Sequence, residues 1–186
     1  MQATAPIQEK SGSSKIIKGR HPLSEPDKAV TLNVEGGFEF AGVLITGPNT
    51  GGKTVAIKTI GLFVLMAQCG LRLPASEVKF GVFCQVWADI GDEQSLQQSL
   101  STFSAHIKNI GQAVREIRPE ALVLLDEIGA GTDPAEGASL AKALLTALRD
   151  SGARIVASTH YGELKVLAYK PDGFTQAAMR FTTKDL

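Results

Sequence analysis

The sequence predicts an α/β fold with a mostly parallel central sheet flanked by helices. Two observations support this prediction. Apolar strand signals alternate with longer helical segments along the chain, and several of the strands are unbroken runs of Val, Ile and Leu, which are typical of parallel strands buried on both faces. Ligands of such sheets bind at the carboxyl ends of the strands, so the residues that follow each strand are the first candidates for a site.

The expected elements follow in chain order. Strands are expected at residues 29–34 and 38–46, then a helix at 52–70, a strand at 85–90, a helix at 103–117, a strand at 121–125, a helix at 134–149, a strand at 153–158 and a short amphipathic helix after residue 161. Pro119 ends the second of these helices. Residues 20–186 are therefore expected to form the globular domain.

Residues 1–19 are expected to be a flexible leader or linker, because they are rich in Ser, Lys, Gln and Ala and show little apolar periodicity. The whole chain has 186 residues, of which 44% are hydrophobic. That is enough for one domain with a full core, and too little for two large ones.

Charge and cysteine content narrow the class of protein. The 19 Lys and Arg balance the 19 Asp and Glu, so the chain lacks the basic excess of an autonomous nucleic-acid binder. Cys69 and Cys84 each lie in an apolar stretch, and we expect both in the core of a protein from a reducing compartment. The longest apolar run is too short for a membrane span. These features predict a cytoplasmic protein without a membrane partner.

The strongest motif follows the strand expected at residues 38–46. It reads Gly47, Pro48, Asn49, Thr50, Gly51, Gly52, Lys53 and Thr54, which fits the phosphate-binding pattern G-x-x-x-x-G-K-[ST] between a strand and a helix. Glycines let the loop turn its N–H groups towards phosphates at the positive end of the helix. Lys53 is expected to contact the β and γ phosphates, and Thr54 to offer its hydroxyl to Mg²⁺. Together with the predicted α/β sheet, the motif predicts a P-loop NTPase fold and binding of ATP with Mg²⁺.

Two adjacent carboxylates end the strand expected at residues 121–125. Asp126 is expected to reach the Mg²⁺, and Glu127 to polarise the water that attacks the γ-phosphate. The alternative is an ordinary acidic pair where a strand meets solvent. A phosphate-binding loop upstream favours the catalytic interpretation and predicts an ATPase.

Three weaker features gain meaning beside these motifs. Ser101 opens a helix, where a capping role is natural and compatible with a phosphate contact. Asp133 precedes Pro134, a pair that is typical of a helix N-terminus, and we expect it to be a cap. His160 ends the strand expected at residues 153–158. A single histidine is more commonly a structural residue, but at this strand end we favour contact with the γ-phosphate.

Taken in order, these stretches resemble the ATPase domain of the MutS family, a branch of the ABC-type ATPases. The landmarks are Arg20-His21-Pro22, the loop from Gly47 to Thr54, Ser101-Thr102-Phe103-Ser104, Asp126-Glu127-Ile128-Gly129-Ala130-Gly131-Thr132 and Thr159-His160-Tyr161. Within the family, one motif is similar to that of the second-type, recombination-suppressing MutS proteins of bacteria. It reads Gly131-Thr132-Asp133-Pro134-Ala135-Glu136-Gly137.

The resemblance implies a site shared by two subunits. ATP or ADP would bind between the ATPase domains of a homodimer, with Ser101 of one subunit approaching the γ-phosphate held by the other and His160 sensing that phosphate. An apolar side chain after Arg20-His21-Pro22 would contact adenine, with Ala29 and Val30 as candidates. The family also implies recognition of branched or mismatched DNA by regions outside this chain, suppression of recombination and, in some members, action on stalled ribosomes.

Second-type MutS proteins also have helical core and clamp regions before this domain and often an endonuclease domain after it. The chain is therefore expected to be a fragment of a longer parent. We expect it to bind ATP, to be mostly monomeric without nucleotide and to hydrolyse ATP slowly.

Two other classes of protein remain open at this stage. One is an ABC-type cassette coupled to transport, whose hallmark is a Leu-Ser-Gly-Gly-Gln helix start, whereas this chain reads Ser99-Leu100-Ser101-Thr102-Phe103. The other is a non-hydrolysing ATP switch that uses the nucleotide only to order a partner surface. Glu127 argues against the switch, because a switch needs no group to activate water.

Overall fold

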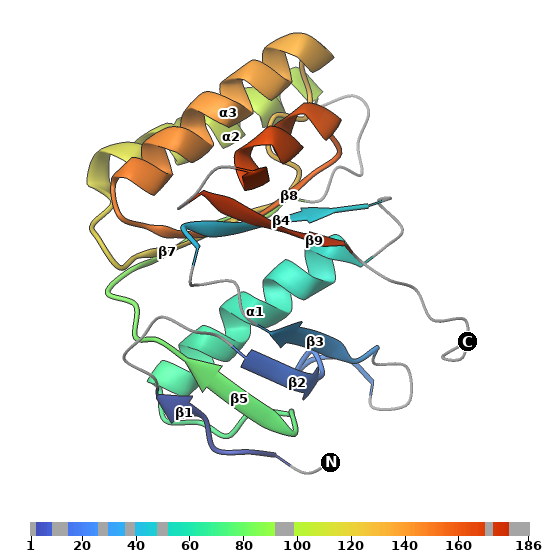
Figure 1. Cartoon of the computed structure of the whole chain (residues 1–186), viewed down its shortest axis with the longest axis vertical. Helices are drawn as coiled ribbons and strands as arrows, with labels where there is room; N and C mark the ends of the chain where they lie inside the picture. Colours follow the sequence, from blue (N-terminus) through green and yellow to red (C-terminus); the bar gives the residue numbers. More distant parts are fainter. Residues whose placement is uncertain are drawn as a thin grey trace.

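A parallel sheet of five strands forms the centre of the structure (Figure 1). In spatial order its strands are β6 (Val86–Asp89), β7 (Leu122–Leu125), β8 (Arg154–Thr159), β4 (Gly42–Thr46) and β9 (Phe174–Ala178), and all neighbouring pairs are parallel. The structure is a computed structural model that describes residues 3–8, 15–25, 30–35, 40–47, 52–91, 99–169 and 173–178.

Helices cover both faces of this sheet, as the sequence predicted. Helix α1 (Lys53–Gln68) lies on one face, while α2 (Ser99–Glu116), α3 (Pro134–Asp150) and the 3₁₀ helix η2 (Gly162–Tyr169) lie on the other (Figure 1). Alternate residues of a strand point to opposite faces. Val43 and Ile45 of β4 accordingly pack in the core on the α1 side, whereas Leu44 between them packs in the core that contains α3. The predicted fold class is confirmed.

A second, smaller sheet packs against the other side of α1 (Figure 1). Its strands follow the order β1 (Ile7–Gln8), β5 (Glu77–Phe80), β2 (Lys15–Gly19) and β3 (Leu32–Glu35). Ile16 of β2 and Val78 of β5 are fully buried in one core with Phe63 of α1. Helix α1 is therefore enclosed between two sheets.

The structure differs from the sequence-based expectation in the first 19 residues. Lys15–Gly19, placed in the expected leader or linker, forms β2, which pairs with both β3 and β5. The segment has only two apolar side chains, Ile16 and Ile17, of which Ile16 is the buried one, and this is too short a pattern to stand out as a strand. The two-residue strand β1 also falls in this segment.

The expectation that Cys69 and Cys84 lie in the core was wrong, because both are exposed free cysteines. Cys69 is the C-cap residue of α1, one position beyond the last helical residue. Cys84 lies in the connection between β5 and β6. An apolar stretch in the sequence thus continued past the point at which the chain turns to the surface.

Two further strands had not been expected: β5 of the small sheet and β9 of the central sheet. The helices and the other strands of the central sheet lie close to their predicted positions. Helix α2 begins at Ser99, so Ser101 lies in its first turn rather than at its cap. Among the described residues, none of the helices combines the length and the apolar character needed to cross a membrane.

Candidate functional site

The carboxyl ends of β4, β7 and β8 meet the first turn of α1 at one edge of the central sheet. Four residues of the predicted phosphate-binding loop, Pro48, Asn49, Thr50 and Gly51, lie outside the described residues. The loop leaves β4 through Gly47, which has φ 139°, and enters α1 through Gly52, which has φ 73°. Both values lie in the region that favours glycine, which accounts for glycine at both ends of the loop.

Lys53 is buried although it carries a charge, with 1% of its surface exposed. Its Nζ donates to the carbonyl oxygen of Gly47 at 2.7 Å and lies 3.9 Å from Oε1 of Glu127. Burial of an ammonium group is costly unless partners offset the lost water. The fold therefore holds this cation where the loop begins and beside the predicted catalytic carboxylate.

Thr54 and Asp126 meet across 72 positions of sequence, as the two predicted metal-binding residues must. The hydroxyl of Thr54 donates to Oδ2 of Asp126 at 2.5 Å. A hydroxyl and a carboxylate are the hard oxygen ligands that Mg²⁺ takes, and Mg²⁺ is commonly held by one or two such groups together with substrate phosphates. Within the described part of the chain, no group of three or more His, Cys, Asp or Glu side chains is arranged to hold a metal ion by itself. The residues present fit a cation that arrives with a nucleotide.

Glu127 has an unusual backbone conformation, with φ 50°. A side chain other than that of glycine costs about 1–3 kcal/mol in such a region and persists only where its surroundings fix it. Its carboxylate lies between two basic side chains, because Oε1 is 3.9 Å from Lys53 and Oε2 is 3.9 Å from Nδ1 of His160. The glutamate side chain is 15% exposed, so water can reach it.

His160 is 45% exposed and lies at the open side of this cluster. It directly follows β8. Its ring contacts the ring of Tyr161, with 4.1 Å between the ring centroids and a tilt of 44° between the ring planes. The structure thus brings together five of the predicted site residues: Lys53, Thr54, Asp126, Glu127 and His160.

Ser158 belongs to the same cluster, and sequence reasoning missed it. It is fully buried, its hydroxyl donates to Oδ1 of Asp126 at 2.5 Å, and it accepts the backbone N–H of Glu127 at 2.8 Å. One hydroxyl group therefore contacts both residues of the acidic pair. A polar residue inside an otherwise apolar strand was the available signal, since a buried hydroxyl needs hydrogen-bond partners.

Asp133 caps α3, as predicted. Its carboxylate accepts the N–H groups of Ala135 and Glu136 at 3.0 and 3.3 Å, and Pro134 follows it. Other predicted residues are less defined. The backbone of Ser101 belongs to the first turn of α2, but its side chain lies outside the described part of the structure. Of the two candidates for the adenine contact, Ala29 also lies outside the described part, and Val30 is exposed.

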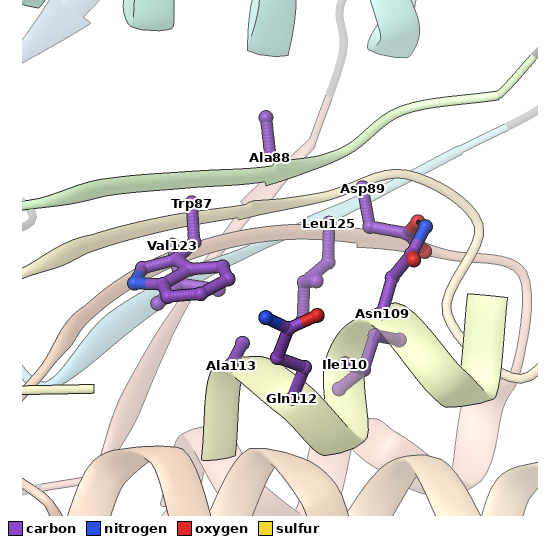
Figure 2. Close-up of a pocket in the computed structure, with 9 residues that line it drawn as sticks. All are labelled: Trp87, Ala88, Asp89, Asn109, Ile110, Gln112, Ala113, Val123 and Leu125. Carbon is purple, nitrogen blue, oxygen red and sulfur yellow. Dashed lines mark hydrogen bonds between the residues drawn. The ribbon is translucent and has the colours of Figure 1, made fainter. Parts of the chain in front are cut away.

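A separate pocket of about 140 Å³ lies between β6 and α2 (Figure 2). Trp87 and Asp89 of β6 face Asn109 and Gln112 of α2 across it. Asp89 is already engaged, since its carboxylate accepts from Asn109 at 3.3 Å and lies 2.6 Å from Nδ1 of His106. None of the predicted site residues lines this pocket.

Comparison with known families agrees with this geometry. Residues 43–185 match the family model described as MutS domain V. The chain belongs to this family, whose members are ATPase domains. The match weakens the alternative of a transport-coupled cassette, which the fold and the acidic strand end alone had left open.

Curated relatives narrow the comparison further. The chain is 51% identical to endonuclease MutS2 of Caldicellulosiruptor bescii, 52% identical to that of Halalkalibacterium halodurans and 53% identical to that of Pelotomaculum thermopropionicum. The alignments cover 97–100% of this chain but 23–24% of the relatives. The chain thus spans about a quarter of the length of these MutS2 proteins, and its similarity includes the segment that forms β2.

Proposed function

We propose that this domain binds ATP together with Mg²⁺ and hydrolyses it, as an ABC-type ATPase domain of a MutS2-like protein. The observation that supports hydrolysis best is the position of Glu127, whose carboxylate lies between Lys53 and His160 and beside the Thr54–Asp126 pair. A domain that only binds nucleotide needs the loop and the metal ligands. It does not need a carboxylate held at this position.

Each residue has a distinct part in this proposal. The loop from Gly47 to Thr54 would surround the phosphates, and Lys53 would place its charge on the β and γ phosphates. Thr54 and Asp126 would hold Mg²⁺, which offsets charge on the triphosphate when it is bound. Glu127 would accept a proton from the attacking water. His160, at the exposed side of the cluster, would contact the γ-phosphate.

We propose further that the site is completed in a homodimer, with Ser101 at the start of α2 reaching the nucleotide of the other subunit. The start of a helix carries a positive dipole end, which favours contact with a phosphate. The parent protein would couple this ATP cycle to branched or mismatched DNA bound by its other regions. The relatives' printed name, endonuclease, and their fourfold greater length support this division of tasks.

Exchange of Glu127 for glutamine tests hydrolysis against a mere nucleotide switch. ATP turnover of the wild type and of Glu127→Gln is measured by phosphate release at saturating ATP and Mg²⁺. Removal of a general base lowers rates by about 10² to 10⁴-fold, so we expect turnover to fall by about that factor. Binding of a fluorescent ATP analogue should persist, because Lys53 and the loop are unchanged.

Glu116→Gln is the matched control, since Glu116 is an exposed residue at the end of α2. Its turnover should equal that of the wild type. Equal rates for the wild type and Glu127→Gln, with ATP bound by both, would instead identify a non-hydrolysing switch.

A further inference from the structure

The turn that follows Glu127 is held in a conformation that needs external support. Glu127, Gly129 and Gly131 have φ values of 50°, 87° and 92°. Within the turn, the N–H of Ala130 donates to the carbonyl oxygen of Glu127 at 3.0 Å. Glycine adopts such angles freely, whereas the glutamate keeps its angle only where neighbouring groups fix it. The contacts of Gly129 show which groups do so.

Tyr161, two residues beyond the end of β8, supports the turn. Its side-chain O–H donates to the carbonyl oxygen of Gly129 at 2.9 Å, and only 8% of the residue is exposed. Its own backbone is fixed as well, because its N–H donates to Oγ1 of Thr159 at 3.1 Å. The phenol thus connects the end of β8 to the turn after Glu127.

Gly137, in the first turn of α3, packs directly against both Tyr161 and Gly129. A Cβ atom at Gly137 would lie 2.6 Å from the hydroxyl oxygen of Tyr161 and would also collide with the carbonyl oxygen of Gly129. A Cβ atom at Gly129 would lie 2.5 Å from the carbonyl oxygen of Gly137. Helix, turn and phenol are therefore in direct contact, with no room for a methyl group between them.

The same Tyr161 ring also contacts His160, at the 4.1 Å centroid distance given above. One side chain thus contacts the imidazole on one side and the turn of Glu127 on the other. The imidazole of His160 and the carboxylate of Glu127 lie next to each other, with 3.9 Å between Nδ1 and Oε2.

We propose that Tyr161 is a positioning residue which, with Gly129 and Gly137, forms a clamp that fixes Glu127 and His160 relative to each other and to the first turn of α3. This inference rests on the proposed ATPase function. The clamp contains neither a phosphate contact nor a metal ligand. A shift of the first turn of α3 would therefore displace Gly129, two residues from Glu127.

Tyr161→Phe tests the clamp, since it removes one oxygen atom and keeps the ring. We expect kcat for ATP to fall by about tenfold, a barrier change of about 1.4 kcal/mol, while KM for ATP stays near the wild-type value. The midpoint of thermal unfolding should fall by only about 2–4 °C, as expected for the loss of one hydrogen bond. Amide hydrogen exchange of Ala130 should become faster. A structural role alone would lower thermal stability and would not separate kcat from KM.

Gly137→Ala is a second test, because its methyl group must displace Gly129 or Tyr161. It should lower kcat by more than Tyr161→Phe does and should also speed exchange at Ala130. Gly111→Ala is the matched control, since a Cβ atom at Gly111 in α2 meets only the end of the Arg115 side chain, at 3.8 Å. Its kcat should remain that of the wild type.

The outcomes separate this inference from the function on which it rests. Wild-type turnover that depends on Glu127, with an unchanged kcat in both Tyr161→Phe and Gly137→Ala, would overturn the clamp and leave the proposed function intact. Absence of turnover that depends on Glu127 in the wild type would overturn the proposed function itself.

Discussion

Ser158 places a single hydroxyl group in contact with both members of the acidic pair. It fixes the carboxylate of Asp126 through one hydrogen bond and the backbone of Glu127 through another. The second bond matters because Glu127 has a strained backbone that needs a fixed neighbour. A residue without any expected contact to substrate therefore sets the geometry of two residues that have one.

Ser158→Ala should lower the free energy of unfolding by about 1–3 kcal/mol, because the buried N–H of Glu127 loses its acceptor and the carboxylate of Asp126 loses a donor. It should also raise the Mg²⁺ concentration needed for half-maximal turnover, since Asp126 is then held less firmly beside Thr54. Urea unfolding and a Mg²⁺ titration of turnover measure the two effects.

Ser139→Ala serves as the control for this substitution, because the hydroxyl of Ser139 is exposed and bonds only within α3, to the carbonyl oxygen of Ala135. It should leave the Mg²⁺ dependence unchanged. Equal behaviour of the two alanine variants would contradict the role assigned to Ser158.

Among single residues, the sequence predicted those that belong to contiguous motifs. Lys53, Thr54, Asp126 and Glu127 stand in recognisable local order, so their types and spacing were sufficient to predict that they lie together. Ser158 was missed because its partners lie 31 and 32 positions away. Such a contact depends on how β7 and β8 pair, which the residue type alone does not reveal.

Among the elements, α3 shows how capping places a helix start. Asp133→Ala should lower the free energy of unfolding by about 1 kcal/mol, because two N–H groups of the first turn lose their acceptor. For a domain of this size the loss corresponds to a decrease of about 2–4 °C in the unfolding midpoint. Thermal unfolding followed by circular dichroism measures it.

Asp150→Ala, at the opposite end of α3, is the control for the cap. The carboxylate of Asp150 is mostly exposed and pairs with its neighbour Arg149, and such exposed pairs contribute little. A larger loss of stability for Asp150→Ala than for Asp133→Ala would contradict the capping argument.

Helix α1 packs against the central sheet at Gly61, where an added Cβ atom would collide with Cδ1 of Leu124 in β7. Gly61→Ala should therefore destabilise the protein by about 1–3 kcal/mol through overpacking, although alanine is the better helix former by about 1 kcal/mol. Gly111→Ala in α2 gains the same propensity without the collision and should stabilise. Chemical unfolding of both variants tests whether the free energy of unfolding falls in Gly61→Ala and rises in Gly111→Ala.

The elements of the central sheet were largely predictable, because strands such as β7 are short apolar runs bounded by turn signals. Most of the small sheet was not, although its strand β3 overlaps the strand expected at residues 29–34. Its strands β2 and β5 pair although some 60 positions separate Lys15 from Lys79, and each carries only one or two buried side chains. Their stability comes from packing on α1 rather than from a pattern within either segment.

For the molecule as a whole, the proposed site needs a second copy, because Ser101 would act on the nucleotide of the other subunit. We expect the chain to be mostly monomeric without nucleotide and its turnover per molecule to rise with protein concentration. Light scattering and turnover measured across a dilution series check both expectations. A tight nucleotide-free dimer in light scattering would contradict the first, and turnover independent of dilution would contradict the second.

Helix α1 begins at the phosphate-binding loop and then passes between the two sheets. It follows that the chain should unfold as one cooperative unit, since the small sheet and the α1 face of the central sheet share one core, which is lost once the helix leaves. A ligand bound at the first turn of this helix would then protect distant strands such as β2 as strongly as the site itself, by about 2.7 kcal/mol at a hundred times its dissociation constant.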